Sequence, residues 1–138
     1  MVNTINMQDM RHLNLFARIT RVDTRFCFKY NETIVFGVPK PLVRRAVGEN
    51  ASNVRQLSQI LRKKIKIIPK PRGIEDAKSF IESIVSPATI NEVVVEGNEM
   101  IVTAGKQSKA VMIGRDKRRL LEMQKIVKDF FGKELRIV

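Results

Sequence analysis

VGENASNVRQL, residues Val47–Leu57, and IGRDKRRLLEM, residues Ile113–Met123, are two versions of one pattern, and they lie 66 residues apart. Each begins with an apolar residue and a glycine, continues through three small or polar residues, and ends in a run of helical periodicity. The chain therefore repeats a glycine-led turn between two helices. We expect a ligand to lie along that turn, and the basic surroundings of both copies make a nucleic acid the first candidate.

The pattern before and after the first turn predicts six elements. In order, they are a helix over 7–20, hairpin strands over 25–30 and 33–38, a short helix over 42–47, a longer helix after the turn, and a strand over 64–69. Asn6 is placed to cap the first helix, and Asn50 or Ser52 to cap the longer one. The longer helix is expected to bury Val54, Leu57, Ile60 and Leu61.

A second cycle of the same elements follows a short connection rich in helix breakers, Lys70–Glu75. Its predicted elements are a helix over 76–85, strands over 92–96 and 100–103, helices over 106–113 and 118–131, and a strand over 134–138. The closing strands align only if the last helix gains four residues, about one turn. We therefore predict two domains, residues 1–70 with an N-terminal helix and residues 71–138.

Net charge is the strongest signal in the composition. The 138 residues include 26 Lys and Arg against 14 Asp and Glu, a formal charge of +12. Such a charge favours phosphate polymers as partners. The sequence contains neither an apolar run of about 18 residues nor an apolar signal core at its N-terminus. We therefore expect no membrane partner and a cytoplasmic location, which the single cysteine also fits.

Catalytic chemistry has little support in the sequence. His12 is the only histidine and Cys27 the only cysteine, and neither a zinc-binding nor a Walker-type pattern occurs. We expect a surface or interface role for His12 and a packing role for Cys27. The sequence therefore predicts no enzyme, no catalytic residue, no metal, no cofactor and no small-molecule substrate.

The order of the predicted elements resembles that of the KH domain in its prokaryotic, type II form, which clamps four nucleotides with a G-x-x-G loop. Two such units after a short helix resemble the archaeal NusA family of transcription factors. The resemblance covers roughly residues 5–138, and Val47–Leu57 follows the family pattern Ile/Val-Gly-x-x-Gly-x-Asn-Val/Ile-x-x-Leu. It is also carried by the lead-in Thr20–Tyr30 and the strands Thr33–Val38 and Lys64–Ile68. The implied fold class is α+β, two tandem type II KH domains, each a small mixed three-stranded sheet with helices packed on one face.

Neither turn keeps the second glycine of the family motif. Ala51 is the mildest replacement, whereas Lys117 loses backbone freedom but brings a cation to the phosphates. Glu49 and Asp116 place carboxylates beside a polyanion and weaken its binding. The first turn is the more electropositive, because ten Lys and Arg stand against one acid between Lys40 and Arg72.

The candidate RNA-binding residues are those of the two turns and the cations and amides beside them. Phosphates are expected at the N-terminus of the helix that follows each turn, where unpaired amides and the helix dipole favour an anion. The candidates are Arg44, Arg45, Gly48, Glu49, Asn50, Ala51, Asn53 and Arg55 in the first unit, and Lys106, Lys109, Gly114, Arg115, Asp116, Lys117, Arg118 and Arg119 in the second.

The resemblance implies a single-stranded RNA-binding factor for transcription elongation, termination or antitermination, acting on nascent RNA near RNA polymerase. Two alternatives remain open. The first is a KH-type protein that binds ribosomal RNA during its maturation or during ribosome assembly. The second is an interaction module whose basic face meets an acidic protein.

Overall fold

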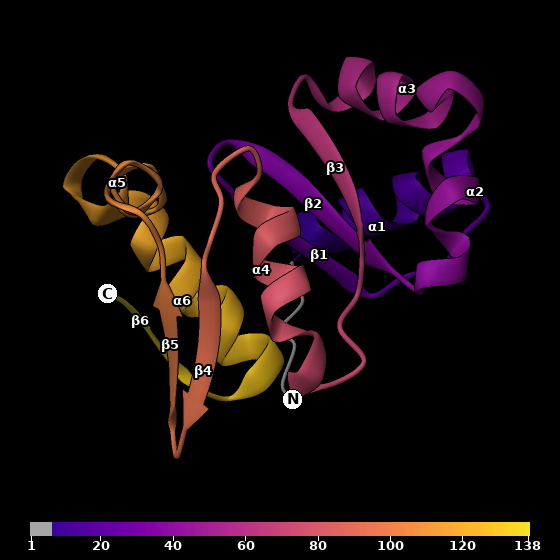
Figure 1. Ribbon diagram of the computed structural model, residues 1–138. Helices are drawn as coiled ribbons and strands as arrows, with labels where there is room; N and C mark the ends of the chain where they lie inside the picture. Colours follow the sequence, from indigo (N-terminus) through magenta and orange to yellow (C-terminus); the bar gives the residue numbers. More distant parts are fainter. Residues whose placement is uncertain (1–6) are drawn as a thin grey trace. The chain divides into compact units, whose positions relative to one another are not determined.

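The computed structural model describes residues 7–138, which form two compact units, one over residues 7–70 and one over Pro71–Val138 (Figure 1). Residues 1–6, which include the predicted helix cap Asn6, lie outside the described residues. Each unit has one mixed three-stranded sheet with packed helices, so the α+β class is confirmed. In the described part of the chain, every helix is too short or too polar to cross a bilayer.

The first unit follows the predicted order of elements. It consists of α1 (Met7–Thr20), β1 (Phe26–Tyr30), β2 (Thr33–Val38), the 3₁₀ turn η1 (Lys40–Leu42), α2 (Val43–Val47), η2 (Glu49–Ala51), α3 (Ser52–Leu61) and β3 (Lys64–Pro69). β2 is central, antiparallel to β1 and parallel to β3. Asn31 and Glu32 join β1 to β2 with φ values of 51° and 61°, as a type I′ hairpin turn requires.

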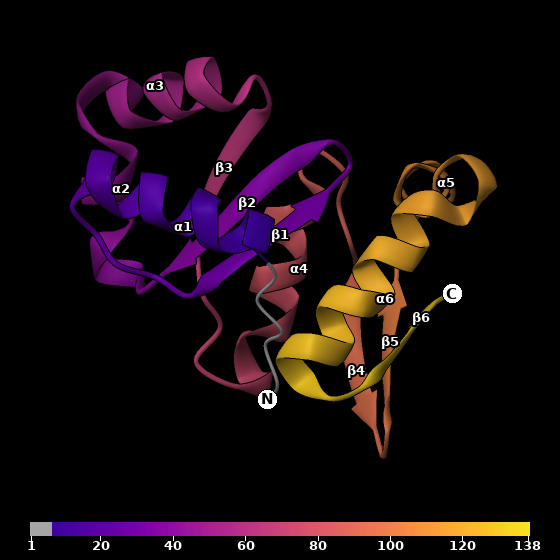
Figure 2. The same cartoon turned by 180° about the vertical axis from the view of Figure 1, so that it is seen from behind.

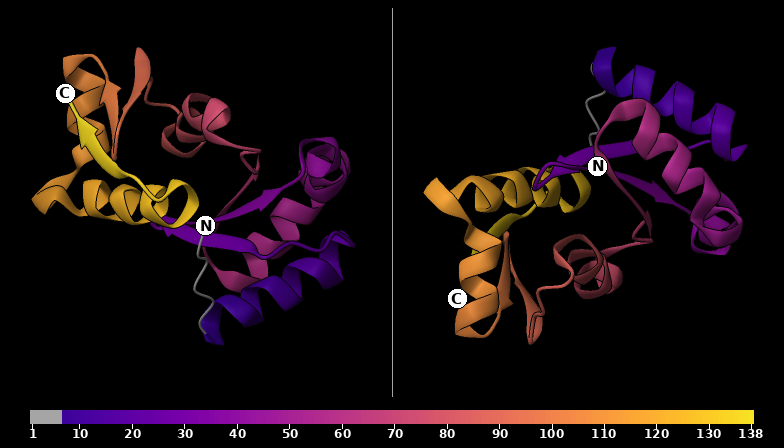
Figure 3. Two further views of the ribbon diagram at one scale, coloured as in Figure 1. Left: turned by 90° about the horizontal axis from the view of Figure 1, so that it is seen from below. Right: turned by 90° about the horizontal axis from the view of Figure 1, so that it is seen from above.

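The core of the first unit lies between its sheet and its helices. α1 and α3 lie side by side on one side of the sheet (Figure 3). Ile34, Phe36 and Val38 of β2 are buried in this core, since alternate residues of a strand share a face. The ring of Phe16 in α1 stacks on Phe36 with 4.3 Å between centroids. Leu57 of α3 belongs to the same cluster, which anchors the helix that follows the glycine-led turn.

The second unit repeats this order. It consists of η3 (Ile74–Asp76), α4 (Ala77–Val85), β4 (Glu92–Glu96), β5 (Glu99–Thr103), α5 (Lys106–Ile113), η4 (Arg115–Lys117), α6 (Arg118–Phe131) and β6 (Glu134–Ile137). β5 is central, antiparallel to β4 and parallel to β6. α6 runs across one face of this sheet (Figure 2).

The two units bury equivalent side chains. α6 has 14 residues and α3 has 10, which confirms the extra helical turn predicted from the spacing of the closing strands. The added turn is packed, because Phe80 of α4 contacts Phe130 and Phe131 with centroids 4.8 and 5.8 Å away. The buried pairs 66 residues apart are Ile34 and Met100, Phe36 and Val102, Ala46 and Met112, and Leu57 and Met123.

The burial predicted for Ile60 is wrong. Its side chain is 53% exposed, although its counterpart Ile126 in α6 is only 4% exposed. Leu57 and Leu61 define the inward side of α3, and Ile60 lies about 100° around the helix from Leu61. The short helix α3 thus buries a narrower face than α6.

Candidate nucleic-acid interface

The first glycine-led turn has an unusual backbone. Gly48 ends α2 with φ 83° and ψ 165°, and its N–H donates to the Arg44 carbonyl at 3.1 Å. The Ala51 N–H then donates to the Gly48 carbonyl at 3.1 Å. Between them the chain turns left-handed, with φ 54° at Asn50 and 58° at Ala51. α3 begins directly after this pair, so the turn ends at a helix N-terminus.

The second turn repeats that backbone residue by residue. Gly114 has φ 75° and ψ 175°, and the left-handed pair is Asp116 and Lys117 with φ 56° and 59°. The two hydrogen bonds recur as Gly114 N–H to the Ala110 carbonyl at 3.1 Å and Lys117 N–H to the Gly114 carbonyl at 3.2 Å. The repeat therefore extends from sequence character to individual dihedral angles.

A side-chain clamp closes each turn. In the first unit the Asn53 side-chain amide donates to the Ala46 carbonyl at 3.1 Å and lies 3.5 Å from the Arg45 carbonyl. In the second unit Arg119, the residue 66 positions later, donates through Nη1 to the Val111 carbonyl at 3.0 Å. Each clamp ties the helix after the turn to the last carbonyls of the helix before it. Both residues were predicted as RNA contacts, and the structure places their side chains on internal carbonyls.

The predicted helix cap in the first turn is wrong. The N-cap of α3 is Ala51 in the left-handed region, and no side chain makes a cap hydrogen bond there. The equivalent N-cap of α6 is Lys117, also left-handed. Asn50 and Asp116 instead allow the left-handed backbone of the turn, since Asn and Asp adopt positive φ more readily than other non-glycine residues. Their shared place in the two turns was the sequence signal for this backbone.

Replacing the left-handed residue before each helix by glycine is expected to stabilise the protein. Ala51→Gly and Lys117→Gly should each raise the free energy of unfolding by about 1 kcal/mol, because the Cβ strain of the left-handed region is removed. Urea denaturation of the full chain measures this. Asn50→Gly is the matched control and should gain less, because Asn tolerates this conformation. A loss of stability in Ala51→Gly would show that its Cβ is not strained.

The predicted cations occupy different positions in the two units. In the first unit they flank the turn, because Arg44 and Arg45 are exposed at the end of α2. Arg55 of α3 donates through Nη1 to the Asn50 carbonyl. In the second unit the cations lie within and directly after the turn, at the exposed residues Arg115, Lys117 and Arg118.

The remaining candidates divide by exposure. Lys106 of α5 and the acids Glu49 and Asp116 are exposed, whereas Lys109, Ala51 and both turn glycines are half-buried. The acids therefore share the exposed surface of the turn with the cations, as the sequence predicts. The exposed positions equivalent to Arg45 and Arg55 in the second unit are apolar: Val111, 46% exposed, and Leu121, 60% exposed.

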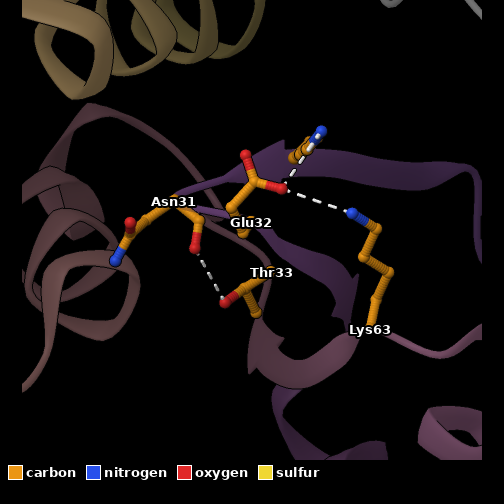
Figure 4. A network of polar contacts seen from close by, with 5 residues as sticks. Asn31, Glu32, Thr33 and Lys63 are labelled. Atoms are coloured by element: carbon orange, nitrogen blue, oxygen red, sulfur yellow. Dashed lines mark hydrogen bonds and ion pairs between the residues drawn. The ribbon is translucent and has the colours of Figure 1, made fainter.

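Several cations that the sequence counts around the first turn are engaged elsewhere. Lys63 Nζ lies 3.2 Å from Glu32 Oε2, which also faces Lys29 Nζ at 3.8 Å (Figure 4). Lys70 Nζ lies 5.1 Å from the Phe26 ring centroid. Arg72 pairs with Asp76 at 3.1 Å, and the hydrogen bond that Arg72 donates to that carboxylate raises the pKa of Arg72. The count of ten cations therefore overstates the positive charge that is available at the first turn.

Comparison with known proteins gives two distant relatives with the same name. No protein-family model matches the chain. A probable transcription termination protein NusA of Methanococcus vannielii is 30% identical over 100 residues, which are 71% of this chain and 56% of that protein. The protein of that name in Halococcus morrhuae is 25% identical over 130 residues, 88% of this chain and 91% of that protein. The chain thus spans about half the length of the Methanococcus protein and is similar to NusA at low identity.

A solved structure shares the fold. The crystal structure of APE1850 superposes with a TM-score of 0.71 at 19% identity, over 97% of this chain and the whole of that one. The likeness therefore concerns the architecture, which extends over both units.

Proposed function

We propose that this chain is a tandem type II KH protein that binds single-stranded RNA at its two glycine-led turns and acts in transcription termination or antitermination. The observation that carries the proposal is the repetition of one strained turn. The two turns lie 66 residues apart and share their dihedral angles, their two hydrogen bonds and a side-chain clamp. In each unit the turn lies at the start of the longer of the two helices that follow the hairpin strands. The names of the two relatives support the role in transcription.

Phosphate binding at these turns follows from the backbone. The first amides of α3 and α6, at Ser52 and Arg118, donate to the Glu49 and Arg115 carbonyls of the turn. The amides that follow them have no partner within their helix, and the helix dipole adds positive potential at the same point. Gly48 and Gly114 let the backbone of each turn pack closely against the start of the following helix, where a Cβ would meet Ser52 and Asn53 or Arg119, so that the turn lies beside the helix N-terminus. Exposed cations at the turn add the salt-sensitive part of the affinity.

The two units are expected to bind RNA with different chemistry. The first presents Arg44, Arg45 and Arg55 beside an Ala51 turn, which favours phosphates on the flanks. The second carries its cations in the turn and has the exposed apolar side chains Val111 and Leu121 on the flanking helices. Apolar side chains beside a phosphate site are suited to contact bases. We assign phosphate binding chiefly to the first unit and a larger share of base contact to the second.

The proposed role needs no reaction at the chain itself. RNA polymerase, or a complex that contains it, is the expected protein partner, because the relatives are named for termination of transcription. The chain would act by holding nascent RNA as it leaves that complex.

A salt titration of RNA binding tests the proposal. With four phosphates per engaged unit and a slope of about −0.7 per phosphate, the logarithm of the binding constant should fall with the logarithm of salt at about −3 for one unit and −6 for both. Fluorescence anisotropy with single-stranded polyuridine gives this slope, and duplex RNA is the control. Equal affinity for single-stranded and duplex RNA would contradict the KH assignment.

Crosslinking in cells, followed by sequencing of the bound RNA, separates the possible roles. Nascent transcripts with co-purified RNA polymerase are the expected result. Recovery of ribosomal precursor RNA alone would favour the ribosome-assembly alternative while leaving RNA binding intact. Retention on an acidic protein matrix but not on RNA would instead favour the interaction-module alternative.

A further inference from the structure

The only histidine and the only cysteine of the chain meet at one place in the first unit. His12 lies on α1 and Cys27 on β1, and Asp9 lies one helical turn before His12. One potential ligand atom from each side chain lies within 4.8 Å of the other two. Within residues 7–138, this is the one group of three His, Cys, Asp or Glu side chains so close together. The sequence predicts no metal, since it contains no zinc-binding pattern.

The three side chains line a real cavity. Its volume is about 160 Å³, and its walls also include Gln8, Lys29 and Lys63. Asp9, His12 and Cys27 are each half-buried, and the cavity that they line is partly open to solvent. This volume holds a cation and several waters, since a water molecule occupies about 30 Å³ of liquid.

We propose that Asp9, His12 and Cys27 form a binding site for a thiophilic divalent cation, with Zn²⁺ as the best match. Zn²⁺ combines thiolate, imidazole and carboxylate ligands in one tetrahedral site. Ligand bonds of 2.0–2.3 Å place tetrahedral ligand atoms about 3.3 to 3.8 Å apart. The three side chains would thus move together by about 1 Å on binding, a change that rotation about their side-chain bonds supplies. Water in the cavity completes the fourth position.

The helix geometry suits a shared cation. Asp9 and His12 are three residues apart on α1, so they lie on the same face of the helix. Cys27 pairs with Phe36 in the sheet register and lies across from that face. A cation held by all three would link α1 to the edge strand β1, in addition to the Phe16 and Phe36 contact.

Two lysines beside the site oppose the binding of a cation unless their charge is partly neutralised. Lys29 and Lys63 stand at the cavity wall, and both face Glu32 Oε2, at 3.8 and 3.2 Å (Figure 4). Glu32 therefore offsets part of their positive charge. Burial, and then the neighbouring Asp9, raise the pKa of the Cys27 thiol to about 12. The thiol thus carries its proton without a cation, and coordination releases that proton to solvent as the sulfur–metal bond forms.

Titration of the untagged full chain with Co²⁺ tests the proposal. Co²⁺ is a spectroscopic probe for tetrahedral zinc sites, and a thiolate ligand adds a charge-transfer band in the near ultraviolet. Because the chain has one cysteine, that band reports Cys27 alone. We expect one Co²⁺ per chain, displacement by Zn²⁺, and a higher melting temperature with either metal.

Three variants identify the ligands. Cys27→Ser should abolish the band, and His12→Asn and Asp9→Asn should each weaken Co²⁺ affinity at least tenfold while keeping a sulfur ligand. Asp23→Asn is the matched control, an exposed carboxylate of the same unit whose loss should change nothing. Circular dichroism without metal checks the fold. If Cys27→Ser does not fold, His12→Asn and Asp9→Asn decide the matter.

Three results would overturn the site: no thiolate band, an unchanged Co²⁺ affinity in His12→Asn, or one metal shared by two chains. The proposal is independent of RNA binding. The metal titration contains no RNA, so its failure would leave the proposed function untouched.

Discussion

Gly48→Ala is expected to lower the free energy of unfolding by about 3 kcal/mol, from strain of about 1–3 kcal/mol at its backbone angles and overpacking of about 1–3 kcal/mol. Its φ of 83° and ψ of 165° belong almost only to glycine. A Cβ there would also lie 2.8 Å from Ser52 Oγ and 3.0 Å from the backbone nitrogen of Asn53. The hydroxyl can rotate away, but the nitrogen is fixed by the first turn of α3. Urea denaturation of the full chain measures the loss.

The same substitution in the second turn should be milder. The three atoms nearest to a Cβ at Gly114 would all belong to the Arg119 side chain, with Cγ at 2.9 Å, whereas at Gly48 a backbone nitrogen is among them. Gly114→Ala should therefore cost mainly the backbone strain, about 2 kcal/mol. Gly97→Ala is the control, because Gly97 has φ 57° but open space around it. Equal losses at Gly48 and Gly97 would show that contact with α3 does not matter.

For the double variant Arg44→Ala, Arg45→Ala we plot the logarithm of the RNA-binding constant against the logarithm of salt concentration. The slope is expected to become less negative by about 1.4, because two phosphate contacts contribute about 0.7 each. Affinity at low salt should fall about tenfold, the effect of two exposed charge pairs. Both arginines are exposed beside the first turn, so their removal leaves the core unchanged. Fluorescence anisotropy across a salt series provides both quantities.

A comparison between units sharpens this test. The double variant Arg115→Ala, Arg118→Ala removes the same charge from the second turn. We expect a smaller loss there because phosphate binding is assigned chiefly to the first unit. Arg119 is left in place, since it closes the clamp on the Val111 carbonyl. Arg11→Ala, Arg18→Ala removes two exposed charges from α1 and is the control. If this control flattens the slope as much, binding depends on overall charge and not on the turns.

The clamp changes how the turns are understood. Asn53 and Arg119 differ in size and charge, yet each donates to one of the last carbonyls of the preceding helix, Ala46 in the first unit and Val111 in the second. The two units thus share a side-chain hydrogen bond to the end of that helix, although the donor residue and the exact carbonyl differ. An alignment of the two copies shows only that Asn53 in the first corresponds to Arg119 in the second. It does not indicate that both side chains make a hydrogen bond to the preceding helix.

Local patterns were sufficient to predict the elements. Hydrophobic periodicity located α1, α3 and α6, and β-branched alternation located β2, because these signals depend on neighbours along the chain. The repeat spacing also predicted the longer second helix, which its 14 residues confirm. The side chain at Ile60 was misplaced because burial at the edge of a helical face depends on the elements packed beside it.

The sequence by itself determined the order of the elements, the duplicated turn and the net charge, all of which follow from residue type and spacing. The tertiary structure alone decided two other features: the closing clamp, and the meeting of Asp9, His12 and Cys27. The physical reason is distance along the chain. A contact between a helix and a strand depends on how the core positions them, and in this protein Phe16 of α1 stacks on Phe36 of the central strand β2, next to which β1 is paired.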